Sequence, residues 1–281
     1  MTRISGWQTP RVAQDGKKNG EAVTQGSPAS RVGASSRPAH VSPSLRTGSA
    51  PPAVQPSFEL KFLLAENVAG AVESWARASL QPDPHGVPAL AGAYGITTLY
   101  LDTPRFDVFH RAPELEGAKL RLRSYGAGGL VYLERKKRQG NRVEKRRTAE
   151  SEGEIGKIES APAAGGPGEW FRAEVLARSF RPACLLTYLR TAFFGTADHG
   201  GFRLTLDRAI VCARASSWAV APIGAGSGAR LAEGGVVCEL KFRTAMPLPF
   251  KELVARLGLA TSPVSKYRQA CVATGLAGER T

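Results

Sequence analysis

The sequence predicts an α+β fold in which antiparallel strands close into a barrel-shaped tunnel with a polar, charged lumen, flanked by a few helices. Two observations lead to this prediction. The stretch 119–136 alternates charged and apolar side chains on both sides of a Gly-rich link, as the two strands of a hairpin do. A Glu-x-Lys spacing also recurs in three separate strands, at 59–61, 134–136 and 239–241.

The hairpin at 119–136 has one charged face and one apolar face, because successive side chains of a strand point to opposite sides. Taken alone, it is most simply an amphipathic hairpin with a solvated charged face. The recurrence of the pattern favours a charged face that points inward. Burying so many charges without a ligand would be very costly, so we expect a wet tunnel that accepts a polyanion and a divalent cation.

Ordered structure is expected to begin with a strand at 57–62, where large apolar residues alternate with polar ones. Apolar residues at helical spacing predict a helix over 66–80, and the Pro- and Gly-rich stretch 81–95 predicts a loop. The β-branched and aromatic run 96–102 predicts a strand that ends at an Asp-Thr-Pro turn. A short helical piece near 105–111 leads into the hairpin.

The strands of the hairpin are expected at 119–123 and 130–136, and a further strand at 141–148 after a Gln-Gly turn. The polar segment 152–168, rich in Gly, Ala and Pro, predicts a loop. Residues 169–180 have the apolar periodicity of an amphipathic helix.

Strands are expected at 185–194, 202–213 and 236–242, with a mobile segment rich in Gly, Ala and Ser at about 215–235. The chain is expected to end with two helices, at 250–257 and 265–274.

The basic excess of the chain indicates a polyanionic partner. The net charge is +14 at pH 7, and most of this excess lies outside the first 56 residues. Residues 1–56 are rich in Ser, Pro, Gly, Ala and Gln, and we expect them to form a disordered, basic, low-complexity tail. A folded domain is expected over 57–276.

The cysteines and histidines do not indicate a metal site. Four cysteines, at 184, 212, 238 and 271, are far apart without CxxC or Cys/His spacing, so we expect buried, reduced thiols. No GxxxxGK[ST] loop is present, so phosphates would have to be bound by side chains. The first residues lack a signal-like apolar region and no run is long enough to span a membrane, which predicts a cytoplasmic protein.

An ordered set of motifs resembles the VTC domain. These are Glu-x-Lys, Tyr-Leu-Asp-Thr-Pro, Lys-Leu-Arg-Leu-Arg, Lys-Arg-Arg, Tyr-x-Arg, Leu-Thr-Leu-Asp-Arg, Glu-Leu-Lys-Phe and Ser-Lys-Tyr, spread over 58–275. The VTC domain is the polyphosphate polymerase domain of the vacuolar transporter chaperone family, within the triphosphate tunnel metalloenzyme, or CYTH-like, superfamily. The resemblance implies an antiparallel tunnel in which ATP binds with Mn²⁺ or Mg²⁺. The γ-phosphate would pass to a growing polyphosphate chain.

The resemblance also implies roles for individual residues. The implied catalytic residues are Lys61, Arg121, Arg123, Lys136 and Arg190. Further phosphate-binding residues are Lys145, Tyr188, Arg203, Lys241, Ser265 and Lys266, the last two acting partly through the N-terminus of the last helix. The main metal ligand would be Glu239, with Glu59 or Glu134 as a second carboxylate.

Structural alternatives stand beside several of these roles. Tyr188 and Arg203 could equally be structural residues of their strands, and a one-residue register error would turn Lys119 and Lys145 outward. The adjacent pair 207–208 is interpreted as a local Asp–Arg ion pair. Asp102 is interpreted as a capping residue of the turn that follows its strand.

Three other functions remain open. Superfamily members that hydrolyse triphosphate or cyclise ATP typically open with Glu-x-Glu-x-Lys. In this sequence Ser57 stands at the position of the first Glu of that pattern, which favours the polymerase-like branch. A tunnel triphosphatase with water as acceptor is the close alternative. A non-enzymatic polyanion binder and a degenerate domain that holds a ligand structurally are the others.

Nucleic acid is not expected as a partner, because the basic strands are interleaved with Leu and Val rather than exposed aromatic residues. The expected partners are ATP and polyphosphate. Polymerase relatives often carry a phosphate-sensing domain and membrane helices. Neither is found in this sequence, so we expect any such function to lie in a separate membrane or regulatory subunit.

Overall fold

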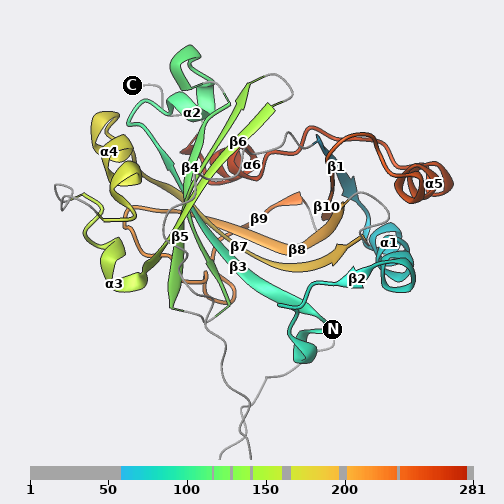
Figure 1. The fold of residues 1–281 in the computed structure, drawn as a ribbon. Coiled ribbons are helices and arrows are strands. Elements are labelled where there is room, and N and C mark those ends of the chain that lie inside the picture. The colour runs from blue at the N-terminus through green and yellow to red at the C-terminus, as the bar shows by residue number, and fades with distance from the viewer. Residues whose placement is uncertain are drawn as a thin grey trace, which may run out of the picture. The chain divides into compact units, whose positions relative to one another are not determined.

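Figure 1 shows the computed structural model of the chain, which describes residues 58–115, 117–126, 129–139, 142–159, 166–195, 201–232 and 235–276. The tail at 1–56 lies outside the described residues, and its predicted disorder therefore stays a prediction.

All the described strands belong to one ten-stranded antiparallel sheet. The hydrogen-bonded path runs through β1 (Phe58–Leu64), β10 (Val236–Phe242), β8 (Arg203–Arg214), β7 (Arg181–Phe194), β3 (Ala93–Asp102), β4 (Lys119–Tyr125), β5 (Leu130–Gln139) and β6 (Arg142–Ser151). Two short strands lie off this path: β2 (Gln81–Pro82) pairs with β7, and β9 (Ala229–Arg230) pairs with β8.

The sheet curls strongly, although its backbone ladder does not close. The Nζ atom of Lys136 on β5 lies 3.2 Å from Oε2 of Glu59 on β1. These strands are six ladder steps apart, which would be roughly 29 Å in a flat sheet. The same face of both halves therefore lines one interior, as expected of a tunnel.

The predicted closure of the barrel needs a correction, because no ladder joins β6 to β1 among the described strands. The backbone N–H of Ser262 donates a hydrogen bond to the carbonyl oxygen of Lys61 (2.8 Å), so the segment before the last helix covers this part of β1. Strand β6 is an edge rich in exposed charged side chains, a composition that discourages further strand pairing.

The described helices are α1 (Glu66–Ser79), α2 (Asp107–His110), α3 (Glu152–Ile155), α4 (Glu169–Ala177), α5 (Leu248–Arg256) and α6 (Lys266–Ala273), with 3₁₀ turns at Pro88–Leu90 and Pro113–Leu115. Helices α1, α3, α4 and α5 pack on the apolar outer face of the sheet, whereas α6 begins beside the charged interior (Figure 1). One core joins α1 and α5 to β1, β10 and β8 through residues such as Val72, Phe250 and Phe62. The other includes Phe171 of α4 and Leu133 of β5.

Every predicted strand and helix is present, and the structure adds elements inside predicted loops. Helix α3 lies in the predicted loop 152–168, where Ile155 and Ile158 are buried. The helix forms because these side chains pack against the core, which the local composition does not reveal. Strands β2 and β9 lie inside the predicted loops 81–95 and 215–235, and β7 begins four residues earlier than predicted.

Two local predictions are confirmed. The carboxylate of Asp102 accepts hydrogen bonds from the backbone N–H groups of Thr103, Val108 and Phe109, so it caps the turn and the start of α2. The four cysteines are buried and unbonded. Within the described part of the chain, no helix combines the length and apolarity needed to cross a bilayer.

Candidate active site: a charged tunnel

Strand register places the predicted site residues on one face of the sheet. Residues directly opposite each other in neighbouring strands share a face. Across β4, β5 and β6 this register gives the rows Arg121–Glu134–Arg147 and Lys119–Lys136–Lys145. Across β1, β10 and β8 it gives Glu59–Lys241–Arg203 and Lys61–Glu239–Thr205, and across β8, β7 and β3 it gives Asp207–Arg190–Tyr94.

These rows line the tunnel, and cations outnumber carboxylates in them. The contact between Lys136 and Glu59 brings the β4–β6 rows against the β1–β10 rows across the interior. Lys119 and Lys145 share the face of Lys136, so the alternative in which a register error turns them outward is excluded. The tunnel therefore presents several cations from different strands to one interior.

Glu59 and Glu239 form a carboxylate pair bridged by two lysines. Lys61 Nζ lies 3.0 Å from Glu59 and 3.7 Å from Glu239, and Lys241 Nζ lies 3.6 Å and 2.8 Å from the same two carboxylates. Burial and the neighbouring Glu239 act to raise the pKa of Glu59, but Lys241, Lys61 and Lys136 outweigh them and hold it at about 2. The Glu239 pKa is also held well below its usual value, since its lysine neighbours outweigh burial. Both carboxylates are therefore ionised at neutral pH.

Glu134 has a different environment, because arginines surround it. Arg121 donates to its Oε2 atom from Nε (2.7 Å), and Arg147 Nε lies 3.4 Å from its Oε1 atom. Arg123 Nη1 is 3.9 Å away. Burial acts to raise the pKa of Glu134, but these arginines lower it to about 2. Glu134 therefore orients arginines, whereas Glu59 and Glu239 lie together.

The carboxylate oxygens of Glu59 and Glu239 suit a hard divalent cation, which would complete its coordination with oxygen atoms of the substrate. Among the described residues, no group of three or more His, Cys, Asp and Glu side chains could hold a metal ion. Mg²⁺ is commonly bound by one or two carboxylates together with phosphate oxygens and water. Of the three predicted ligands, Glu239 and Glu59 are the two that the structure brings together.

Asp207 is the buried centre of a second charge cluster. Arg190 binds it with two hydrogen bonds, from Nε (2.6 Å) and Nη2 (2.7 Å), and Lys266 Nζ lies 2.7 Å from its Oδ2 atom. The predicted local pair of residues 207 and 208 is wrong, because adjacent strand residues point to opposite faces. Arg208 instead contacts Glu66 and Glu73 of α1 on the outer face.

The start of α6 reaches the tunnel. Ser265 caps the helix by accepting a hydrogen bond from the Arg268 backbone, and its hydroxyl also receives one from Lys119 Nζ (3.1 Å). Lys266 Nζ lies 5.4 Å from the ring centroid of Tyr188, and the Arg190 guanidinium lies 5.6 Å from the same ring. Ser265, Lys266 and Tyr188 are thus all near the tunnel cations, as the sequence predicts.

Arg203 lies on the tunnel face, but its guanidinium is bound by residues that sequence reasoning missed. Nη2 donates to Asp83 Oδ2 (2.8 Å) and to the Tyr94 hydroxyl (3.0 Å). Asp83 lies next to β2, in a Pro-rich segment without periodicity, so no sequence signal could have found it. Arg147 was also missed, although its two-residue spacing from Lys145 predicts the same face.

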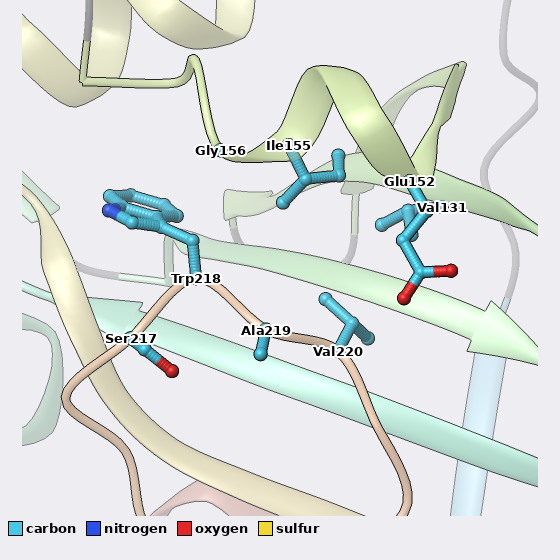
Figure 2. A pocket seen from close by; sticks show the side chains of 8 residues that line it. All are labelled: Val131, Glu152, Ile155, Gly156, Ser217, Trp218, Ala219 and Val220. Atoms are coloured by element: carbon cyan, nitrogen blue, oxygen red, sulfur yellow. The ribbon is translucent and has the colours of Figure 1, made fainter.

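An open cavity of about 320 Å³ lies on the other face of the sheet (Figure 2). Its lining comes from β5, the α3 region and the segment 217–220, and consists of Val131, Glu152, Ile155, Gly156, Ser217, Trp218, Ala219 and Val220. The lining is mainly apolar, with one carboxylate and no cation. It does not suit a polyanion, so the charged tunnel is the candidate active site.

Three solved structures of low identity resemble this chain. A candidate adenylate cyclase from Vibrio parahaemolyticus is 15% identical with a TM-score of 0.44, covering 76% of this chain and 96% of that chain. One from Bacillus halodurans is 13% identical with a TM-score of 0.45, covering 75% and 95%. A candidate adenylyl cyclase from Hippeastrum, described as having a dominant triphosphatase activity, is 16% identical with a TM-score of 0.43, covering 77% and 95%.

No curated protein sequence matches the chain. The family model described as the VTC domain matches residues 57–274. This match covers nearly all of the part that folds into the tunnel and contains every residue of the candidate site. The chain therefore belongs to the VTC domain family.

Proposed function

We propose that this protein is a metal-dependent polyphosphate polymerase, which transfers the γ-phosphate of ATP to a growing inorganic polyphosphate chain inside the tunnel. The observation that carries the proposal is the single tunnel face on which cations from β1, β4, β5, β6, β7, β10 and α6 outnumber the carboxylates. An elongated anion with charge on every phosphate matches such a surface. Arg forks and Lys ammonium groups are suited to phosphate oxygens.

The chemistry would consist mainly of positioning and charge neutralisation. Arg121 and Arg123 are pre-oriented by Glu134, Tyr100 and Thr98, so they can bind phosphate oxygens with little loss of freedom. An acceptor phosphate is already ionised and needs little help from a general base. Lys61, Lys136 and Arg190 would complete the neutralisation of charge in the transition state, and Lys145, Tyr188, Arg203, Lys241, Ser265 and Lys266 would position the phosphate chain.

Glu239 and Glu59 would hold Mn²⁺ or Mg²⁺, whereas Glu134 would keep its arginines in place. A bound divalent ion neutralises charge on the transferring phosphoryl group. Lys61 and Lys241, which bridge the two carboxylates, would then be free to turn toward phosphate oxygens.

The deciding experiment is incubation of the purified protein with γ-labelled ATP and Mn²⁺, with products separated on a gel. A ladder of phosphate chains is expected, and Arg121→Ala should abolish it. The control is Arg146→Ala, which removes an exposed arginine of the outer face of β6 and should leave the ladder intact. Free orthophosphate without a ladder would instead assign the triphosphatase reaction, and no turnover would contradict both enzymes.

Removal of divalent metal is expected to stop turnover without unfolding the protein, because the ion would be held by two carboxylates, and the part of the chain that the structure describes contains no larger cluster of metal ligands. The measurement is product formation with excess EDTA, followed by addition of Mn²⁺ or Mg²⁺, with the melting temperature recorded in parallel. Full activity in excess EDTA would contradict the proposed metal dependence.

Phosphate-chain affinity is expected to fall between pH 7 and pH 9. Burial, with Lys61, Lys136 and Arg121, outweighs Tyr100 and lowers the pKa of Lys119 to about 8. Lys145 lies on the exposed edge strand β6, but partial desolvation by its neighbours, with Lys241, Lys136 and Arg121, still outweighs Glu59 and lowers its pKa to about 8. Both amines are mostly charged at pH 7 and mostly neutral at pH 9, so the tunnel loses up to two positive charges over this range.

Calorimetric titration with inorganic tripolyphosphate should show this loss as a drop in affinity of roughly tenfold or more. The Lys119→Arg/Lys145→Arg double variant should flatten the pH profile, because guanidinium groups stay charged. An affinity of the unmodified protein that does not change from pH 7 to pH 9 would exclude a contribution of these lysines.

A further inference from the structure

Three tyrosines and an arginine form a continuous aromatic cluster on the tunnel face. The ring centroids of Tyr94 and Tyr125 are 6.3 Å apart with the rings tilted, and those of Tyr125 and Tyr132 are 5.6 Å apart, edge to face. The guanidinium carbon of Arg147 lies 3.6 Å from the Tyr132 centroid and 5.2 Å from the Tyr125 centroid. The aromatic cluster thus crosses β3, β4, β5 and β6 beside the phosphate-binding cations, and none of its members is assigned a phosphate contact in the proposed function.

Arg147 is held on one side and open on the other. The two tyrosine rings lie against its guanidinium, and Glu134 Oε1 lies 3.4 Å from its Nε atom. Its side chain is nevertheless 45% exposed, on the edge strand β6. A flat cation fixed in this way offers a preformed stacking surface, since little rotational freedom remains to be lost on binding.

The chemistry of the aromatic cluster suits a planar heterocycle better than a phosphate. A phosphate gains little from the face of a tyrosine ring, whereas nucleobases stack on aromatic side chains and on guanidinium planes. Tyr132 lies directly opposite Arg123 in the ladder, and Glu134, which binds Arg121, is the next residue on the same face. A base stacked on Arg147 would therefore lie close enough to place its phosphates at the two arginines that the proposed function assigns to them.

We propose that Arg147, backed by Tyr132 and Tyr125, is the surface of the tunnel on which the nucleobase of the ATP donor stacks. This inference rests on the proposed function for the position of the phosphates. It adds a distinction between donors: inorganic tripolyphosphate binds through the cations alone, whereas a nucleotide also contacts Arg147 and the tyrosines behind it.

The test compares dissociation constants for ATP and for inorganic tripolyphosphate, measured by calorimetry in one buffer. Tyr132→Leu is expected to weaken ATP binding roughly tenfold and to change tripolyphosphate binding less than twofold. Tyr132→Phe keeps the ring and should retain the affinity for ATP. A second variant, Arg147→Met, should weaken ATP more than tripolyphosphate, and it answers the question if Tyr132→Leu does not fold.

The matched control for Arg147 is its neighbour Arg146, which points to the opposite face and stacks on Trp170 at 4.6 Å. Arg146→Met removes the same charge from the same strand and should change neither affinity. Equal weakening of ATP and tripolyphosphate by Tyr132→Leu, or no weakening of either, would overturn the nucleobase subsite. Failure of the unmodified protein to bind tripolyphosphate would instead overturn the proposed phosphate tunnel, and a loss of ATP binding in Tyr132→Leu would still support the subsite.

Discussion

Replacing Asp207 by alanine is expected to lower the free energy of unfolding by roughly 3–5 kcal/mol. The carboxylate is fully buried and compensates two buried cations, Arg190 and Lys266. Its removal leaves both without their countercharge in a poorly solvated interior. For a domain of this size the melting temperature should fall by about 10 °C, which thermal unfolding followed by circular dichroism would measure.

A polyanion should partly repair this defect, because its phosphate oxygens can supply the missing negative charge. Inorganic tripolyphosphate is therefore expected to raise the melting temperature of Asp207→Ala by more than that of the unmodified protein. The control is Glu66→Ala, which removes an exposed ion pair with Arg208 on the outer face and should cost less than about 1 kcal/mol. Equal melting temperatures of Asp207→Ala and the unmodified protein would show that the contacts of Asp207 with Arg190 and Lys266 do not contribute measurably to stability.

The alternation of side chains along single strands accounts for most of what the sequence predicts here. Two-residue spacing assigns Arg121 and Glu134 to charged faces of their strands, and the register of β4 and β5 places them opposite each other. The same rule predicts the position of Arg147 from that of Lys145. It also shows why residues 207 and 208 cannot pair locally, since neighbours on a strand point to opposite sides.

The partners of these side chains could not be predicted, because they depend on how the sheet curls. Asp83 lies 120 positions from Arg203 in sequence, in a segment without periodicity, yet the two form an ion pair. The different surroundings of the three Glu-x-Lys carboxylates also depend on how the sheet curls. Glu59, Glu134 and Glu239 share the Glu-x-Lys spacing, and only the fold places two of them together and leaves the third among arginines.

The lysines of the tunnel illustrate a conflict between stability and binding. Lys119 and Lys145 have pKa values lowered to about 8, so each amine binds its proton more weakly in the folded chain than in the unfolded one. This difference costs stability below about pH 8, where the amines are charged. At neutral pH these charged amines therefore cost stability. A protein under no demand to bind anions would gain from replacing them, and their presence on this face favours a function that needs the charge.

The separation of the carboxylates leads to the sharpest expectation for catalysis. Glu239→Gln should lower turnover roughly 100-fold and raise the Mn²⁺ concentration needed for half-maximal activity, because an amide is a weaker ligand than a carboxylate. Glu134→Gln should leave the metal requirement unchanged and raise the KM for ATP, since it loosens Arg121 and Arg147. Both variants remove one buried negative charge from the same tunnel face, so each is the charge-matched control of the other.

Steady-state rates measured over a series of Mn²⁺ and ATP concentrations separate the two effects. A shift of the metal dependence in Glu239→Gln alone would assign Glu239 as a metal ligand and Glu134 as a positioning residue. Equal shifts in both variants would mean that general tunnel charge, rather than direct coordination, governs metal binding. The distinction follows from the contacts: Glu239 has a second carboxylate beside it, reached through Lys241, whereas the cations in contact with Glu134 are arginines.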